Sequence, residues 1–535
     1  MNGTIKLKIL AENFLNFLCS FCFLTYTLGG YSIDGDHGLS YITDLFNLTS
    51  ICVFLGFAFG LDLGQIFIFQ GFNNFQTFLQ KKEKLKLPGM FILICLSLFL
   101  MSFYIVPIIR HHSFSSYFWD LAVMEQVIWR RAFGYGLTST AITNQFNPPL
   151  DFLWNQHLNF WLIPISFLYR LFPHTETLLI LQSTALLLAF VPLWKISREF
   201  LPRWIPPILF PAFFWMWNTI HKNNVWDIHE ACYLPLFSFW AYYFFLKRKW
   251  LYVGLFTLVI ALFKEDAWVL AGAMAFYFFS ANKKFFLAVF AFLVGFGIFV
   301  VYGILCDKVI PLSDRYAYLG NSFSEALPII SHNPFVFFQH LVTPGPLLFL
   351  VKVLTVTGGL WLLGGWAIIA IIPNLFECAL STNPGMYSFD YHYAIAFSGP
   401  LFFSAFMGLN KLDSLKISIN KKKMILYGAT AIALSQLFYS EPVQIKNYLQ
   451  SKGWKTRQCY LALLNHVPVD ATVYSQDPLV SHLSSRPLLF FNYNVKSYLP
   501  NSIIVEPAGT TLPPGFFVVQ QACGQMIASN FRQSP

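Results

Sequence analysis

Charged residues are scarce in this 535-residue chain: only 11% are Asp, Glu, Lys or Arg, whereas a soluble domain carries about a quarter. This scarcity excludes an ordinary soluble globular protein. The hydrophobic fraction is 56%, and it recurs as apolar runs of about 20 residues, long enough to cross a bilayer as helices. The runs do not alternate between polar and apolar residues, as strands of a membrane β-barrel would. The sequence therefore predicts an all-α polytopic membrane protein.

Metal-binding spacings are also missing. The nine cysteines include no pair of CxxC motifs, and His229-Glu230 is not followed by the second histidine of an HExxH motif. We expect that no cofactor is required, although the carboxylates could hold a divalent metal. Cys459 and Cys523 share the C-terminal tail and could pair if that tail is extracytoplasmic, but free buried thiols are the default expectation.

Positive charge is concentrated in a few short connections, although the net charge is +10. Because cytoplasmic loops accumulate Lys and Arg, the basic segments are predicted to be cytoplasmic. They are residues 81–86, 195–203, 246–250, 282–284 and 410–423. The mildly basic start, "MNGTIKLKIL", shows no small-residue cleavage site and is expected to be a retained cytoplasmic end.

About thirteen membrane helices are expected, and no internal repeat relates them. They lie at 9–31, 46–71, 89–109, 153–172, 176–195, 203–220, 231–246, 249–264, 266–281, 285–305, 347–373, 393–410 and 424–440. This number conflicts with the basic loops, because two cytoplasmic loops must be separated by an even number of crossings. The segment 153–172, polar at its start, and the segment 347–373, interrupted by four glycines, could each be a partial span.

The remaining connections are predicted to lie on the outer face. They are residues 110–152, 221–230, 264–266, 306–346 and 374–392. The last helix would deliver residues 441–535 to the same side. There "NYLQSKGWKTRQCYLALLNHV" predicts a helix, and "ATVYS", "PLLFF" and "SIIVEP" predict short strands, so the tail is expected to be a small α/β domain.

Ionisable residues near membrane depth are functional candidates, because their cost must be offset. In "YFWDLAVMEQVIWRR", Asp120 and Glu125 belong to an amphipathic stretch that could lie along the membrane surface. A carboxylate there could remove a proton from an acceptor hydroxyl. The alternative, of equal weight, is a solvated face with an Asp near a helix start.

Two further outer segments carry candidate side chains. In "FNPPLDFLWNQHLNFW", Asp151 and His157 stand at the mouth of a helix, although Asp151 could simply help start that helix. In "VWDIHEACY", His229 and Glu230 are adjacent, and a metal site is only weakly indicated.

The run "LFTLVIALFKEDAWVLAGAMAF" places Lys264, Glu265 and Asp266 in a row between two apolar segments. A helix–helix turn would explain this position, with the acids capping the second helix and the lysine reaching the interface. It does not explain why the turn needs all three charges.

A single outer site would explain more, because charges that converge can pair instead of standing alone in lipid. Lys264, with Arg315 from "SDRYAYLG", would neutralise an anionic group such as phosphate, and the carboxylates would bind hydroxyls. This inventory suits a hydroxyl-rich substrate with a phosphate and a lipid tail.

The residues also resemble a known family. The stretches "YFWDLAVMEQVIW", "HEACYLPLFSFWAYYFFLKRKW", "KEDAWVLAGAM", "YHYAIAFSGPLFF" and "VPVDATVYSQDPLVSHLSSRPLLFF" resemble, in order and spacing, the DUF2079 family of predicted membrane proteins, over roughly residues 105–510. The organisation is similar to that of the GT-C superfamily, membrane glycosyltransferases that use polyprenyl-phosphate-linked sugars. The resemblance implies extra helices in residues 1–88, a GT-C-like domain in residues 89–440 and a separate domain in residues 441–535.

In the GT-C superfamily the first large outer loop carries a catalytic acid on an interfacial helix, and Asp120 matches that position, with Glu125 second. The separation of these two acids departs from the adjacent pair expected there. The resemblance implies a transferase that moves a sugar from a polyprenyl-phosphate donor to an extracytoplasmic glycan or lipid acceptor in the inner membrane. No nucleic-acid partner is expected, because the positive charge is explained by cytoplasmic loops. The alternative is a lipid or solute transporter that uses Lys264, Glu265 and Asp266 as a coupling site.

Overall fold

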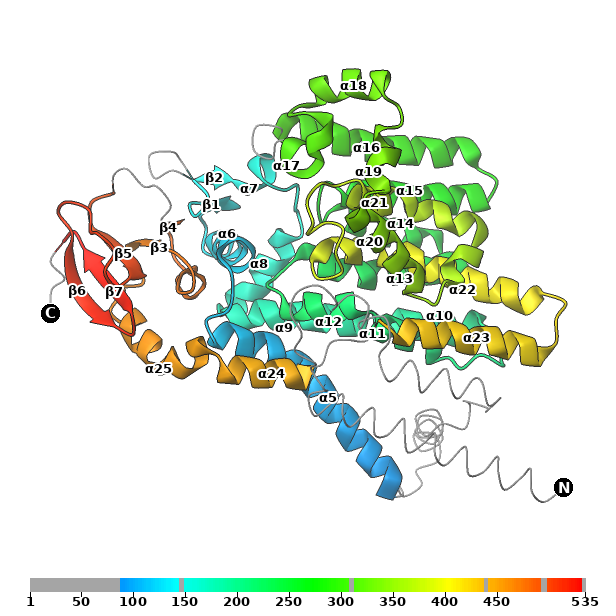
Figure 1. The fold of residues 1–535 in the computed structure, drawn as a ribbon, viewed down its shortest axis with the longest axis horizontal. Coiled ribbons are helices and arrows are strands. Elements are labelled where there is room, and N and C mark those ends of the chain that lie inside the picture. Colours follow the sequence, from blue (N-terminus) through cyan, green and yellow to red (C-terminus); the bar gives the residue numbers. More distant parts are fainter. Residues whose placement is uncertain (1–86, 144–148, 307–311, 437–440, 492–497, 532–535) are drawn as a thin grey trace.

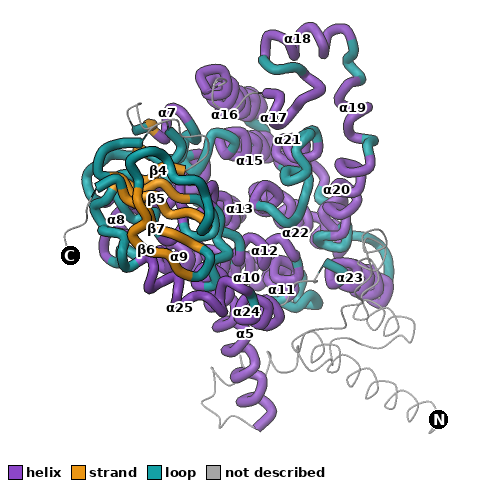
Figure 2. Tube along the Cα trace, turned by 60° about the vertical axis from the view of Figure 1, so that its left-hand side comes forward, coloured by secondary structure: helices purple, strands orange, loops and turns teal. Residues whose placement is uncertain are grey.

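The computed structural model describes residues 87–143, 149–306, 312–436, 441–491 and 498–531. The expected spans at 9–31 and 46–71 lie outside these residues. Helices make up most of the described chain, and a five-stranded sheet stands at one end of it (Figure 1; Figure 2, orange). The chain is thus mainly helical, as predicted, with a C-terminal sheet domain.

The helical part divides into three consecutive stretches. The first contains α5 (Leu87–His112), η2 (Phe118–Ala122), α6 (Val123–Ala132), β1 (Thr138–Ser139), β2 (Leu150–Asp151), α7 (Phe152–Asn155) and α8 (Leu162–Leu171). The second contains α9 (Thr175–Leu188), α10 (Phe190–Phe200), α11 (Leu209–Met216), α12 (Asn218–Val225), η3 (Glu230–Tyr233), α13 (Leu234–Leu246), α14 (Trp250–Ala261), α15 (Ala267–Ala281) and α16 (Phe285–Cys306). The third contains α17 (Leu312–Tyr316), η4 (Ala317–Leu319), α18 (Phe323–His332), α19 (Val336–Leu341), α20 (Pro344–Thr355), η5 (Leu360–Leu363), η6 (Gly365–Ala370), α21 (Ile372–Ala379), η7 (His392–Phe397), α22 (Ser398–Ser414) and α23 (Ile419–Leu434).

Among the described residues, three helices are long and apolar enough to cross a membrane. They are Thr175–Phe200, Phe285–Leu305 and His392–Ser414. Other apolar helices, such as α14 and α15, are shorter. The expected number of about thirteen spans is therefore not confirmed.

Two predicted spans conflicted with the even number of crossings required between cytoplasmic loops, and the structure shows that both are irregular. In the segment 153–172, α8 has only ten residues, about 15 Å of helix against a hydrocarbon core of about 30 Å. In the segment 347–373, α20 ends at Thr355 and two short 3₁₀ helices follow. Gly358, Gly359 and Gly365 there have positive φ, which breaks the helix.

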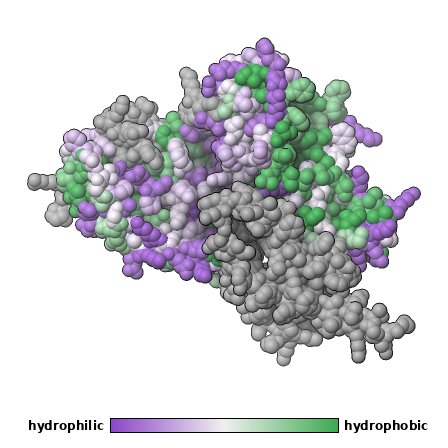
Figure 3. All heavy atoms as spheres, in the orientation of Figure 1, coloured by the Kyte–Doolittle hydropathy of each residue, from purple (hydrophilic) through white to green (hydrophobic). Residues whose placement is uncertain are grey.

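Exposed apolar side chains gather on the helical part, whereas the end that carries the sheet is more hydrophilic (Figure 3). On α16, Phe286 and Phe290 are 91% and 66% exposed, as expected of a helix that faces lipid. The inner side of α16 packs closely on α15 because Gly272 and Gly295 leave no side chain between the two backbones.

The C-terminal domain begins with α24 (Glu441–Gln450) and α25 (Lys452–Leu464) and continues into a mixed sheet. Its further elements are β3 (Thr472–Ser475), η8 (Val480–His482), β4 (Leu489–Phe491), β5 (Ser502–Pro507), β6 (Phe517–Ala522) and β7 (Gln525–Ser529). The strand order is β4-β3-β5-β7-β6, with β3 parallel to both of its neighbours and β7 antiparallel to both of its own. Cys459 and Cys523 form a disulfide, so the default expectation of free thiols is wrong.

Buried contacts hold this domain against the helices. Helix α24 lies along α5, and its first residue, Glu441, forms a fully buried ion pair with His221 of α12. Ring contacts continue the interface: His482 stacks on His111 with centroids 4.1 Å apart, and Phe491 stacks on Phe118 at 3.8 Å. The sheet domain is therefore fixed beside η2.

We expect Cys459→Ser to lower the free energy of unfolding of the C-terminal domain by about 4 kcal/mol in the loop-entropy model, because the disulfide joins residues 64 positions apart. Thermal unfolding of the purified protein, with Cys523→Ser and the double variant alongside, measures the effect, and all three variants should agree. Maleimide labelling of both cysteines in the unreduced wild type would contradict the pairing.

Candidate functional site

The predicted amphipathic stretch is a short π-helical turn, η2, that continues into α6. Asp120 lies in the first turn of η2, and its side chain is 27% exposed beside the exposed ring of Trp119. Glu125, one turn later, is fully buried. The two acids therefore occupy different surroundings although they are only five positions apart.

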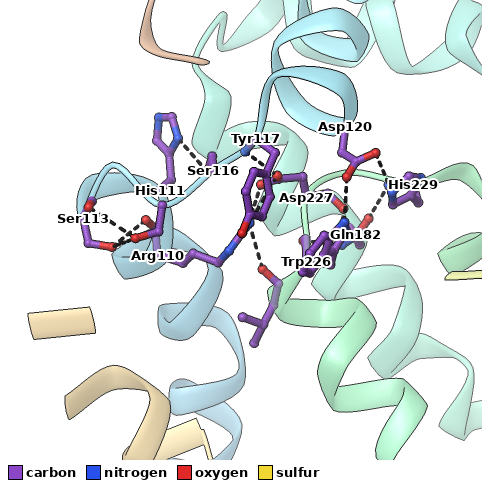
Figure 4. A network of polar contacts seen from close by, with 12 residues as sticks. Arg110, His111, Ser113, Ser116, Tyr117, Asp120, Gln182, Trp226, Asp227 and His229 are labelled. Atoms are coloured by element: carbon purple, nitrogen blue, oxygen red, sulfur yellow. Dashed lines mark hydrogen bonds and ion pairs between the residues drawn. The ribbon is translucent and has the colours of Figure 1, made fainter. Parts of the chain in front are cut away.

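The Asp120 carboxylate is bound from the segment 226–229 (Figure 4). The indole N–H of Trp226 donates to Oδ2 over 2.7 Å, and Nε2 of His229 lies 3.5 Å from Oδ1. Burial alone would raise the pKa of Asp120, but the hydrogen bonds from His229 and Trp226 and the charge on Arg110 lower it below the ordinary value. The carboxylate is therefore ionised at neutral pH.

A buried ion pair supports this arrangement from behind. Arg110, at the end of α5, binds the fully buried carboxylate of Asp227 with both terminal nitrogens. Oδ2 of Asp227 also accepts the backbone N–H of Tyr117 over 2.8 Å, which fixes the start of η2. The Arg110 guanidinium carbon lies 5.4 Å from the Tyr117 ring and 5.2 Å from the Trp226 ring.

The next residues connect Asp120 to the lysine of the charged triplet. Glu230 directly follows His229, and its Oε1 lies 3.5 Å from Nζ of Lys264, with both side chains buried. The ring of His229 stacks on His392 with centroids 3.7 Å apart, and Lys264 Nζ lies 5.8 Å from the ring of Tyr393. The contacts that run from Asp120 through His229 and Glu230 to Lys264 therefore connect the three predicted segments that contain these residues.

The triplet occupies the turn between α14 and α15. Glu265 accepts a hydrogen bond from the backbone N–H of Leu158 over 3.1 Å and lies 2.9 Å from Nδ1 of His157. Burial opposes ionisation of Glu265, yet the charges of His157 and Lys264 lower its pKa to about 2. For Lys264, burial lowers the pKa, and the negative charges of Asp266, Glu230 and Glu265 outweigh it, so the ammonium stays charged.

Arg315, on α17, faces the same group of charges. It interacts electrostatically with Glu265 and with Glu377 of α21. Burial raises the pKa of Glu377 to about 8, and the negative charge of Asp266 adds to that effect while Arg315 opposes it. At neutral pH this carboxyl therefore carries a proton.

Two predicted residues lie apart from these charges. Glu125 accepts hydrogen bonds from Tyr169 and Thr175 of the helical part and from Ser484 and Ser485 of the C-terminal domain, over 2.6 to 3.2 Å. Its carboxylate therefore joins the helical part of the chain to the C-terminal domain, apart from the charges around Asp120 and Lys264.

Asp151 is exposed, and its Oδ1 accepts the backbone N–H of Leu153 over 3.0 Å at the start of α7. This contact matches the structural alternative for that residue, which is helix initiation. In contrast, the structure gathers His157, His229, Glu230 and the Lys264–Asp266 triplet into one connected set of charges.

Several residues of the site were missed by the sequence analysis. In the sequence, Arg110 resembles the positive residues that commonly flank an apolar helix, and Trp226 is one of many aromatic residues. Glu377 lies in a predicted connection without a recognisable motif. His392 and Tyr393 stand in "YHYAIAF", where ionisable and aromatic residues interrupt an apolar run, and that signal could have found them. Within the described ranges, no group of three or more His, Cys, Asp or Glu side chains is arranged to hold a metal ion.

Comparisons with known proteins give one family match. Residues 110–509, which are 400 of the 535, match the family described as "Predicted membrane protein (DUF2079)". No curated protein matches the chain. Among solved structures, the chain is similar to the crystal structure of ArnT from Cupriavidus metallidurans bound to undecaprenyl phosphate, with 12% identity, a TM-score of 0.46 and coverage of 82% of this chain and 98% of that one.

The buried carboxylate of Glu125 generates a pH-dependent prediction. Burial raises its pKa above the ordinary value despite its hydroxyl partners. When a carboxyl has a higher pKa in the folded state than in the unfolded state, its protonated form stabilises the folded protein. This contribution is fully present at pH values below the unfolded-state pKa, and it is lost as the pH rises through the folded-state pKa. Glu125→Gln, neutral at every pH, should therefore raise the unfolding temperature at pH 8 relative to the wild type, and the difference should shrink at pH 5.

Glu125→Ala, which removes the acceptors altogether, should lower the unfolding temperature at both pH values. A Glu125→Gln protein that is less stable than the wild type at pH 8 would show that the ionised carboxylate is the stabilising form.

Proposed function

Because the chain belongs to the DUF2079 family of predicted membrane proteins and joins Asp120 to Lys264 through one set of contacts, we propose that it is an integral-membrane transferase. It moves a sugar from a polyprenyl-phosphate donor to an acceptor on the extracytoplasmic face. The sequence resemblance to the GT-C superfamily supports this proposal, since Asp120 matches the acidic position on the interfacial helix of the first outer loop.

The observation that carries the proposal is the division of the site into an acidic and a basic side. On one side Asp120 is ionised, partly exposed, hydrogen-bonded to the Trp226 indole and close to the His229 ring. On the other side Lys264 and Arg315 provide two positive charges near Glu230 and Glu265. Such a pair of sides suits a displacement in which a proton leaves the acceptor and negative charge builds up on a phosphate.

In the proposed reaction, an acceptor hydroxyl oxygen attacks the anomeric carbon of the donor sugar. The new carbon–oxygen bond forms as the bond from that carbon to the phosphate oxygen breaks, and the polyprenyl phosphate leaves with the bonding electrons. Asp120 takes the acceptor proton. Because a carboxylate of low pKa is a weak base, the proton moves only as the new bond develops. A single displacement of this kind inverts the anomeric carbon.

The leaving group gains negative charge during this step, and Lys264 and Arg315 would balance it. Lys264 is held by Glu230 before the reaction, so its ammonium is already oriented and largely desolvated. Exposed rings near Asp120, those of Trp119 and Tyr391, offer flat surfaces for a sugar.

The disulfide in the C-terminal domain supports the assignment of the outer side. Disulfides persist in oxidising compartments and are rare in the cytosol. The domain that contains Cys459 and Cys523 is packed on η2, so the two lie on the same side of the membrane. An outer position for both agrees with the basic loops predicted to be cytoplasmic.

We expect Asp120→Asn to reduce sugar transfer by about 10² to 10⁴, the range usual for loss of a general base. The assay supplies a panel of labelled polyprenyl-phosphate sugars and outer-face acceptors to the full chain in proteoliposomes. Asp413→Asn is the matched control, because Asp413 also accepts an indole hydrogen bond of 2.7 Å, from Trp204, far from the site. Equal transfer by wild type and Asp120→Asn would remove Asp120 from its role.

Replacing Lys264 should reduce the positive charge on the basic side of the site. Lys264→Gln is expected to lower turnover by about 10² or more, because the charge on the leaving phosphate is no longer balanced. Lys222→Gln is its control, since Lys222 forms a more exposed ion pair with Asp390. Turnover by Lys264→Gln equal to wild type, with an unchanged unfolding temperature, would contradict this role.

A further inference from the structure

The contacts around Asp120 extend beyond the groups that touch its carboxylate, because Trp226 is itself enclosed by other side chains. Trp226 binds the carboxylate, and its ring is held on three sides. The ring lies 5.2 Å from the guanidinium carbon of Arg110, and its centroid lies 5.3 Å from those of Tyr117 and Tyr391. Figure 4 shows Trp226 between the Arg110–Asp227 pair and Asp120.

The backbone of the same segment is fixed by Gln182 of α9. Its Oε1 accepts the backbone N–H of His229 over 2.8 Å, and its Nε2 donates to the carbonyl of Asn223 over 2.9 Å. Gln182 is fully buried. Trp226 and His229, which both contact the carboxylate, therefore belong to a short segment that one side chain anchors at two points.

We propose that Trp226 is a positioning residue that keeps the Asp120 carboxylate ionised and directed toward the acceptor, with the Arg110–Asp227 pair as its support. This inference rests on the proposed transferase function. It adds that the lower pH limit of the reaction is set by the indole hydrogen bond and by the charges around Asp120.

Charged groups face Asp120 from three directions. His229 comes from the segment after α12, Arg110 from α5 with its partner Asp227, and Asp477 from the loop after β3 in the C-terminal domain. Burial and the negative charges of Asp227 and Asp120 raise the pKa of Asp477, and by the same repulsion Asp477 favours the protonated form of Asp120. Trp226 and Asp477 therefore act on Asp120 in opposite senses.

Trp226→Phe keeps an aromatic ring among the same neighbours, and it removes the indole N–H together with the second ring of the indole, a truncation that Trp204→Phe reproduces at a distant site. We expect the acidic limb of the pH profile of kcat/KM to move upward by about one pH unit, which corresponds to a tenfold change in proton affinity. Asp477→Asn should move the limb downward. Trp204→Phe, which removes the 2.7 Å indole hydrogen bond to Asp413, is the control and should leave the limb where it is.

A second measurement reports the protonation of Asp120 without any transfer. A water-soluble carbodiimide with an amine nucleophile modifies protonated carboxyls, and mass spectrometry of the full-length protein in proteoliposomes gives the pH at which Asp120 is half-protected. This midpoint should rise in Trp226→Phe and remain unchanged in Trp204→Phe. An unchanged midpoint in Trp226→Phe overturns the inference.

The two measurements separate the inference from the proposed function. If the labelling midpoint and the acidic limb move together in Trp226→Phe, Asp120 is the group whose ionisation permits transfer. If the midpoint moves and the limb does not, Trp226 tunes Asp120 but the limit of the reaction is set elsewhere, which overturns the link to catalysis. If the wild type transfers no sugar at any pH, the transferase proposal fails while the midpoint still decides the role of Trp226.

Discussion

The cost of a charge in apolar surroundings is the constraint on which the site depends. Lys264, Glu265 and Asp266 lie between two apolar helices, where an unpaired charge is expensive. Removing one partner of a buried pair leaves a charge uncompensated, which is far more costly than never having buried the pair. Lys264 therefore pairs with Glu230, and Glu265 pairs with His157. The elements that carry Glu230 and His157 must consequently meet at the α14–α15 turn.

This constraint explains why part of the site could be predicted from the sequence. Charged triplets and His-Glu pairs stand out in a chain with so few ionisable residues, and their partners had to come from elsewhere on the same face. The glycines in 347–373 likewise signalled a broken helix. The polar start of 153–172 also indicated a partial span, and α8 within it has ten residues. The packing of α8 against α6 could not be predicted, because no local pattern names the partner of an apolar face.

The surroundings of Glu125 depend on contacts that no local pattern shows. This residue was grouped with Asp120 because both belong to one amphipathic stretch, yet its carboxylate is buried by hydroxyls from Ser484 and Ser485, some 360 positions later in the chain. The same contacts position the C-terminal domain. Together with the rings stacked at Phe118 and His111, they hold it against the helix that carries Asp120.

In the proposed function, Asp120 and Lys264 belong to one site that receives a single lipid-linked sugar. An experimental structure of the full chain with a non-hydrolysable polyprenyl-phosphonate sugar in lipid nanodiscs tests it most directly. We expect the phosphonate oxygens within hydrogen-bonding distance of Lys264 or Arg315, with the anomeric carbon facing Asp120. A headgroup bound away from both cations, or Asp120 separated from His229 and Lys264 from Glu230, would contradict it.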